Sequence, residues 1–217
     1  MGNLFNRWLL CFALWILMLN PASGQTVSRI VYGDGVREML AMGRVGQYEF
    51  NGRSGDVVTV RLLRVSGSWD PAMVILGADG RLLERQTGNR IQVDRTLSQD
   101  GVYSVLVSDV GEDESGLYSL ALETLNGPAQ FHKQVVNGSV VTDTLQFEGD
   151  LAGFSFEGFP GDAVMLRATV LGGVDQEMEL FGPDGKRMEK DNPGFFSTTP
   201  TLRITRQLDL TGIYKVV

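Results

Sequence analysis

The chain has 217 residues, of which 43% are hydrophobic and 21% charged, with a formal net charge of −7, one histidine and one cysteine. This composition is too apolar for a disordered polypeptide, and the single histidine and cysteine leave little for a transition-metal or nucleophilic site. The acidic balance disfavours phosphate backbones and anionic lipid surfaces, so no nucleic-acid partner is expected.

Residues 1–24 have the pattern of a secretory signal peptide. Arg7 precedes an apolar run from Trp8 to Leu19, and residues 21–24 supply small side chains for cleavage after Gly24. The run is short for a bilayer core, which needs about 20 helical residues. Cys11 lies inside the run, without the small residue that precedes a lipoprotein cysteine. We therefore expect an exported protein, secreted or periplasmic, with no membrane span and no cysteine after cleavage.

Residues 25–125 are predicted to form a first β-sandwich. Apolar residues alternate with polar ones in segments 48–62, 74–76 and 103–107, which is the period of half-buried strands. Gly55-Asp56 and Asp79-Gly80 lie between such segments and have the chemistry of tight turns. No segment after residue 24 keeps a helical apolar period with caps at both ends. Seven or eight short antiparallel strands, packed as two sheets, are the expected all-β architecture.

Residues 126–130 are the predicted linker, because Asn126-Gly127-Pro128 interrupts the strand pattern. Residues 131–217 then repeat the first unit. Segment 48–61 aligns with segment 154–167, with six of 14 positions identical, and the later segments 70–81 and 101–107 align in the same order with 175–186 and 212–217. A period of this length indicates tandem domains rather than a solenoid.

The ordered motifs resemble the bacterial pre-peptidase C-terminal domain family. The pattern is Phe/Tyr-x-Phe-x-Gly-x-x-Gly-Asp-x-Val, then the segment 67–71 (Gly-Ser-Trp-Asp-Pro), then Leu-x-x-Asp-Gly, then Gly-x-Tyr-x-Val-x-Val. The resemblance covers nearly all of the chain after the leader. It implies two jelly-roll-like sandwich modules of the kind attached to secreted peptidases and other exported bacterial proteins. The second copy departs from the pattern at residues 172–176, where the proline after Asp175 is missing.

The second copy is predicted to lack its last strand. In the first copy, Tyr103 is followed by an acidic loop and a strand at residues 117–122, whereas the second copy stops three residues after Tyr214. The missing strand would expose ladder groups and part of the core. We expect the chain to be a fragment of a longer product, with a peptidase or other domain covalently linked beyond Val217. A complete chain would have a marginal second domain, or one that borrows a strand.

No catalytic, cofactor-binding or metal-binding residue is assigned, and the chain is predicted not to be an enzyme. His132 is the only imidazole and is interpreted as a satisfied surface or strand histidine. Arg61 and Arg167 are expected to be solvated or paired. The aspartates shared by the two copies fall at turn positions, where side chain to backbone bonding is the ordinary role; they are Asp56, Asp70, Asp79, Asp162, Asp175 and Asp184.

Calcium is the candidate cofactor, because some members of the resembled family bind it and exported acidic β-modules often have oxygen-rich loops. The densest acidic cluster comprises Asp109, Glu112, Asp113 and Glu114. Their spacing does not match the Asp-x-Asp-x-Asp-Gly loop, so a solvated acidic loop is the default interpretation.

Two functions are compatible with these features, and a third, an enzyme in its own right, would need a cleft of converging carboxylates that the sequence does not announce. The first is a non-catalytic, exported tandem module that helps to secrete, position or tether a larger extracellular or periplasmic protein. The alternative is an adhesive module that binds glycan or matrix protein, with or without calcium. Adhesion would need exposed aromatic side chains: Trp69 is expected at the core edge, whereas Phe195 and Phe196 adjoin in a Pro/Gly loop and either expose one ring or cap the sandwich.

Overall fold

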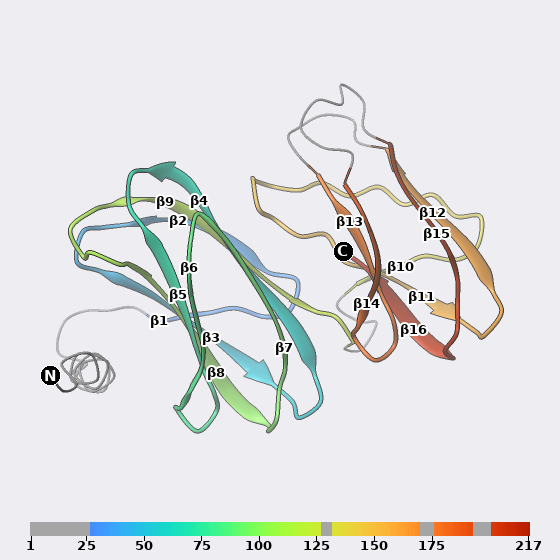
Figure 1. Cartoon of the computed structure of the whole chain (residues 1–217), viewed down its shortest axis with the longest axis horizontal. Coiled ribbons are helices and arrows are strands. Elements are labelled where there is room, and N and C mark those ends of the chain that lie inside the picture. Colours follow the sequence, from blue (N-terminus) through green and yellow to red (C-terminus); the bar gives the residue numbers. More distant parts are fainter. Residues whose placement is uncertain (1–26, 127–131, 170–175, 193–200) are drawn as a thin grey trace, which may run out of the picture.

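The computed structural model describes residues 27–126, 132–169, 176–192 and 201–217. The predicted leader, linker residues 127–130, Asp175, Phe195 and Phe196 lie outside these ranges. The described residues form strands, turns and loops, with no helix, and they group into two sandwich-like bodies that lie side by side (Figure 1). The all-β prediction is confirmed. No described segment is a helix long and apolar enough to span a bilayer.

The first body pairs a five-stranded sheet with a four-stranded one. The five-stranded sheet has the order β1-β3-β8-β5-β6, with bounds Val27–Arg29, Val45–Gly52, Gly101–Asp109, Pro71–Leu76 and Leu82–Thr87. The four-stranded sheet has the order β2-β9-β4-β7, with bounds Gly35–Leu40, Gly116–Thr124, Val57–Gly67 and Arg90–Thr96.

The core of the first body lies between these sheets. On β4 and β9 the inward positions are apolar and buried, and they alternate with outward positions of mixed polarity; the inward set is Val58, Val60, Leu62, Tyr118, Leu120 and Leu122. Each such side chain contributes about 1.5–3 kcal/mol by leaving water. Trp69 is also fully buried, with its ring edge-on to Tyr118, so it belongs to the core.

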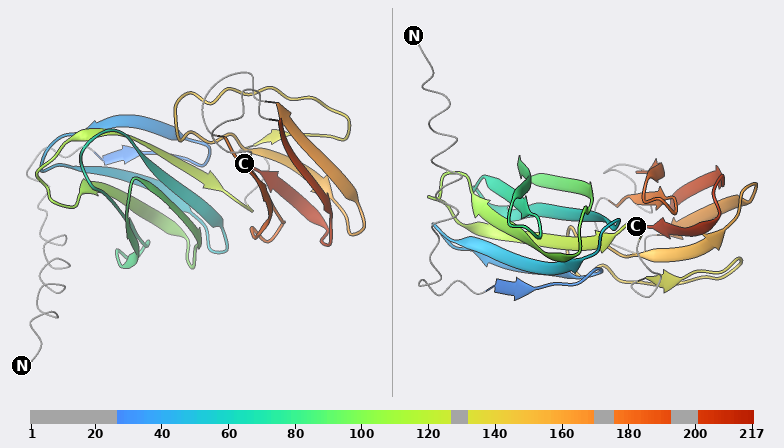
Figure 2. Two further views of the ribbon diagram at one scale, coloured as in Figure 1. Left: turned by 45° about the horizontal axis from the view of Figure 1, so that its top comes forward. Right: turned by 90° about the horizontal axis from the view of Figure 1, so that it is seen from below.

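The second body has a matching large sheet and a much smaller partner sheet. Its five-stranded sheet has the order β10-β11-β16-β13-β14, with bounds Lys133–Gln134, Phe154–Gly158, Gly212–Val216, Met178–Phe181 and Arg187–Asp191. The smaller sheet pairs β12, Ala163–Thr169, with β15, Thr201–Gln207. Figure 2 shows these two layers beside those of the first body.

The two five-stranded sheets share one strand order. Each begins with a short strand parallel to its neighbour, and all other pairs are antiparallel. Phe50 on β3 stacks on Tyr103 on β8 with ring centroids 5.5 Å apart, and Phe156 on β11 stacks on Tyr214 on β16 at 5.5 Å. The same inward side chains therefore build the centre of both bodies.

Four of the shared aspartates make the predicted turn bonds. The Asp56 and Asp162 carboxylates each accept the backbone N–H three residues earlier, both at 3.0 Å. Asp79 and Asp184 each accept the N–H two residues later, at 3.0 and 3.1 Å. The glycine after each of the latter has φ of 74°, a left-handed conformation that favours glycine and closes the hairpin.

Candidate functional site

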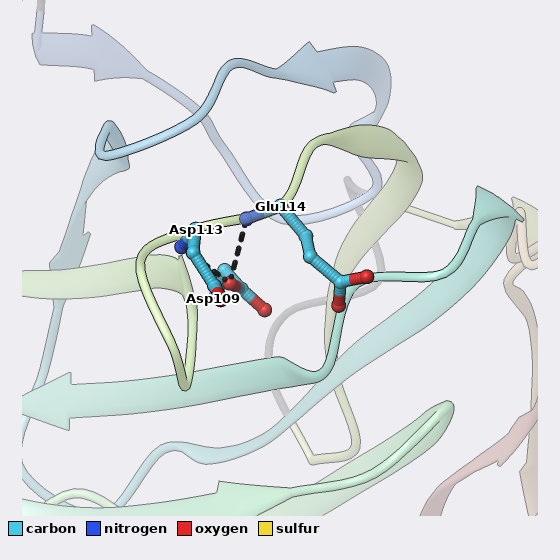
Figure 3. A group of neighbouring side chains, drawn as sticks. All are labelled: Asp109, Asp113 and Glu114. Carbon is cyan, nitrogen blue, oxygen red and sulfur yellow. Dashed lines mark hydrogen bonds between the residues drawn. The ribbon is translucent and has the colours of Figure 1, made fainter.

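The acidic loop between β8 and β9 brings three carboxylates together. The ligand-type oxygens of Asp109, Asp113 and Glu114 lie within 4.8 Å of one another, and Figure 3 shows them converging on one side of the loop. Glu112, which the sequence placed in the same cluster, is not part of this group. By donor type alone, this is the arrangement that suits a hard cation such as calcium.

The hydrogen bonds of Asp109 give it a structural role in this loop. One carboxylate oxygen accepts the Asp70 N–H at 2.8 Å, and the other accepts the N–H groups of Asp113 and Glu114 at 3.1 and 3.2 Å. Burial alone raises the pKa of Asp109, but these backbone donors outweigh it and hold the pKa below its usual value. Asp109 therefore ties the loop to the start of β5, and calcium binding stays a prediction.

A shallow depression beside this loop offers no catalytic constellation. It is lined by Asp70, Pro71, Thr87, Gly88 and Val110. Only one of these side chains is ionisable, so the depression has no acid and base pair to share a proton transfer.

The junction between the bodies holds a buried ionisable cluster of Glu123, His132 and Lys215. Glu123 comes from β9 of the first body, His132 follows the predicted linker, and Lys215 comes from β16 of the second body. The Glu123 and Lys215 residues are 1% and 0% exposed, and the His132 ring is fully buried. His132 Nε2 lies 2.9 Å from Glu123 Oε1, and Lys215 Nζ contacts His132 Nδ1. The interpretation of His132 as a surface or strand residue is therefore wrong, because it packs inside this junction.

The strand period explains why these charges meet. On β9, Ser119, Ala121 and Glu123 point away from the core of the first body, and on β16 Lys215 lies between the inward residues Tyr214 and Val216. Outward positions of a sandwich normally face water and carry polar residues. Here the outward faces of the two sheets pack against each other, so the polar residues are buried together.

The electrostatics of the cluster follow from this burial. Desolvation lowers the pKa of Lys215 to about 8, and the Glu123 carboxylate opposes the shift. Lys215 can donate to His132 Nδ1 when that nitrogen is unprotonated, which places the ring proton on Nε2, facing Glu123. The approach of Nε2 to Glu123 is close but not aligned as a hydrogen bond, so the contact is mainly electrostatic.

Gly153 closes the cluster from the second body. A Cβ at this position would lie 2.2 Å from a ring carbon of His132 and 2.8 Å from a Glu123 oxygen. The backbone thus approaches the cluster as closely as a glycine allows.

A second set of ion pairs joins the bodies at β4. Arg61 Nη2 lies 2.9 Å from Glu177 Oε1, and Lys190 binds the other Glu177 oxygen at 2.7 Å. Burial raises the pKa of Glu177, but Lys190, Arg61 and Arg90 outweigh it, so the pKa lies below its usual value. Arg61 was predicted to be either solvated or paired, and the structure shows that it is paired. Arg167, its aligned partner, is exposed.

A neutral hydrogen bond completes the junction, since the Ser119 hydroxyl donates to the Glu148 carbonyl at 2.6 Å. Sequence reasoning missed Glu123 and Lys215 as members of a site. One signal was present, because Lys215 aligns with Ser104 and puts a charge beside the core residues of a central strand.

Fold and junction together define an all-β protein of two sandwich-like bodies joined by a buried polar interface. No family model matches the chain, and no curated protein sequence matches it. Solved structures match about half of its length.

Three of these solved structures illustrate the likeness, and none of them assigns a function to this chain. The pre-peptidase C-terminal domain of a collagenase from Bacillus anthracis aligns at 18% identity and a TM-score of 0.40, over 46% of this chain and 96% of that domain. CorA, a surface-associated copper-binding protein of Methylomicrobium album BG8, aligns at 8% identity and a TM-score of 0.34, over 45% of this chain and 98% of CorA. A beta-glucosidase from Paenibacillus barengoltzii aligns at 14% identity and a TM-score of 0.24, over 46% of this chain and 11% of the enzyme.

Proposed function

We propose that the chain is a non-catalytic, exported accessory module that helps to secrete, position or tether a larger extracellular or periplasmic protein. The junction is the observation that supports this role. Relative motion is the default for domains unless their interface is large and hydrophobic. We propose that the buried ion pairs of this polar junction instead hold the two bodies at a fixed spacing and orientation. The ionisable groups of Glu123, His132 and Lys215 are buried in this junction and bind one another.

The domain scheme belongs to the same proposal. The repeated motifs and the common strand order support two copies of one unit, at residues 25–125 and 131–217, separated by a linker at 126–130. The leader pattern of residues 1–24 supports export. The partner is a protein or polysaccharide outside the cytoplasm, or a peptidase or other domain covalently linked after Val217.

Rigidity is the first property to test. Spin labels on Met39→Cys and Phe159→Cys, in a chain with Cys11→Ser, place one exposed label on each body. We expect a single narrow distance distribution. Glu123→Leu should broaden it, whereas Arg203→Met, which removes an exposed charge from the second body, should leave it unchanged. A broad distribution in the parent would contradict a positioning role.

Export of a passenger tests the role itself. A reporter enzyme fused after Val217 is compared with the same reporter fused directly after Gly24, and the amount of active reporter outside the cytoplasm is measured. We expect residues 25–217 to increase it. Equal amounts of active reporter from both fusions would contradict the secretion role. Separately, the intact mass of the natural product would show whether a further domain is linked to the modules.

Among the described residues, the adhesive alternative rests on Phe159 alone, whose side chain is 50% exposed. Trp69 is buried, and Phe195 and Phe196 lie outside the described ranges. Binding to glycan or matrix protein that is lost in Phe195→Ala and Phe196→Ala would revive it.

A further inference from the structure

The smaller sheet of the second body presents an exposed face without acidic residues. β12 and β15 form the side of this body that lies away from the first body (Figure 1). The chain as a whole has 26 acidic against 19 basic side chains. Along the two strands the outward residues are exposed, and they pair across the ladder as Ala163↔Gln207, Met165↔Thr205, Arg167↔Arg203 and Thr169↔Thr201. This face is therefore a local exception, with two positive charges and no negative one.

The two arginines of this face stand directly opposite each other. Residues paired across a ladder have Cβ atoms about 4.5–5.5 Å apart, and like charges in such a pair destabilise a sheet. Within the described structure neither guanidinium has a hydrogen bond or an ion pair, and only the backbone N–H of Arg203 is bonded, to Asp191 Oδ2 at 2.6 Å. The pair thus gives the fold no stabilising contact. Two guanidinium groups at this spacing can both donate to one carboxylate.

The aligned face of the first body binds a carboxylate in this way. β4 aligns with β12, and β7 aligns with β15 through the buried pairs Ile91 and Leu202, Val93 and Ile204, and Leu97 and Leu208. Arg61 therefore corresponds to Arg167, and Gln92 corresponds to Arg203. Arg61 Nη2 binds Glu177 Oε1 at 2.9 Å and donates to Gln92 Oε1 at 3.1 Å. The carboxylate of Glu177 comes from the second body, so the arginine on this face meets an acid from another sandwich.

The contact between the bodies extends along β4. A Cβ built on Gly185, in the turn between β13 and β14, would lie 2.6 Å from the Val57 Cβ, and one built on Gly149 would lie 3.2 Å from the Leu63 Cβ. Arg61, between these two points, is only 8% exposed. The outward face of β4 is thus an interface. The outward face of β12 has the same place in its own body, and all its residues are exposed.

We propose that the outward face of β12 and β15 binds an acidic segment of another protein, with Arg167 and Arg203 both donating to one carboxylate of that segment. The template for the contact is Glu177 bound to Arg61. The second arginine adds a charged donor where the first body has a glutamine, and the exposed Met165 beside the pair offers an apolar contact for residues that flank the carboxylate. This site goes beyond the accessory role proposed above and does not depend on it.

A protein segment fits this face better than other acidic partners. The aligned arginine already binds the carboxylate of a polypeptide, which favours a protein over an acidic polysaccharide. A second copy of the chain could not repeat that contact, because its own Glu177 is held by Arg61 and Lys190.

Poly-L-glutamate tests the site as a probe for acidic segments, using the full chain and a fluorescent label on the polymer. We expect saturable binding by fluorescence anisotropy at low salt, although the chain and the probe are both acidic. The double variant Arg167→Gln/Arg203→Gln loses charged hydrogen bonds and should bind at least about tenfold more weakly. The matched control, Arg29→Gln/Arg44→Gln, removes two exposed arginines from the first body and should bind as the parent does.

Methionine methyl NMR locates the bound probe. Met165 lies on the proposed face and is 62% exposed, whereas Met39 is 66% exposed on β2 of the first body. Poly-L-glutamate should shift the methyl signal of Met165 and leave that of Met39 in place. Equal shifts of the two signals would contradict binding at this face.

The single variant Arg203→Gln separates binding from folding. It restores the arginine–glutamine pairing that the first body has at Arg61↔Gln92. Because two like charges are no longer opposed, hydrogen exchange in β12 and β15 should be unchanged or slower, while binding of the probe weakens. Faster exchange would show that the arginine pair serves the fold instead of a partner.

Three outcomes of the binding experiment would also overturn the proposal. Undiminished binding by the double variant would show that these arginines are not the site. Binding of polygalacturonate at least as tight as that of poly-L-glutamate, with the same dependence on the arginines, would assign the face to an acidic glycan. Concentration-dependent self-association that the double variant loses would identify a second copy of the chain as the occupant.

Discussion

The two bodies have the same five-stranded sheet but differ in what lies across from it. In the first, four strands cover the core and seal β4 from both sides, whereas in the second two strands leave the aligned residues of β12 partly exposed. Matching sequence segments therefore reach different degrees of burial. The burial of side chains along a strand therefore depends on the neighbouring strands as much as on the strand itself.

The largest effect should come from Glu123→Leu, which tests whether the second body depends on the first. The substitution leaves Lys215 buried without its carboxylate, and removing one partner of a buried pair costs about 3–5 kcal/mol. We expect hydrogen exchange in β16 to accelerate. In a chain that begins at Gln25, Trp69 is the sole tryptophan and reports on the first body, so its fluorescence transition should barely move. Equal loss in both bodies would contradict a one-sided dependence.

The next largest effect should be a pH dependence of stability that is confined to the second body. Lys215 has a pKa lowered to about 8 in the folded protein, below its unfolded value of 10.5, so the unfolded chain binds more protons between these limits. The stability of the second body should rise with pH from 8 to 10.5, by roughly 2–3 kcal/mol at about 1.4 kcal/mol for each unit. The measurement is the difference between wild type and Lys215→Met, followed by hydrogen exchange and corrected for its intrinsic pH dependence. A difference that stays flat over this range would contradict the shifted pKa.

A matched pair of core substitutions tests the role of the neighbouring strand. Val58→Ala removes a fully buried side chain and should cost about 2 kcal/mol, whereas Val164→Ala should cost under about 1 kcal/mol because its site already meets water. Trp69 fluorescence in denaturant measures the first cost, and hydrogen exchange measures the second. Equal costs would mean that an open edge does not weaken the second core.

An effect about half that of Val58→Ala should be the same in both bodies. The Tyr103 hydroxyl donates to the Gln99 carbonyl and the Tyr214 hydroxyl to the Leu210 carbonyl, both at 2.8 Å. Loss of either bond, in Tyr103→Phe or Tyr214→Phe, should cost about 1 kcal/mol. The same two probes measure it, and clearly unequal costs would show that the bodies differ at their centres as well as at their edges.

Much of the fold could be predicted from local sequence, because strand alternation and aspartate turns act over a few residues. Val58 and Val60 alternate as the strand requires, and Asp79 bonds within its own turn. The junction could not be predicted in this way. His132 follows Glu123 closely across the predicted linker, but Lys215 lies 83 residues after His132, and the outward strand positions of Glu123 and Lys215 ordinarily face solvent. Only the packing of one body on the other makes them neighbours.

The place of the last strand in each large sheet governs how the chain can fold. β8 and β16 come last among the strands of their sheets, yet each lies at the centre, between strands formed much earlier. β11 and β13 thus have no common partner until residues 212–216 arrive, and pairings over such long separations form slowly. In a chain synthesised from its N-terminus, β8 completes the large sheet of the first body long before β16 is available to complete that of the second.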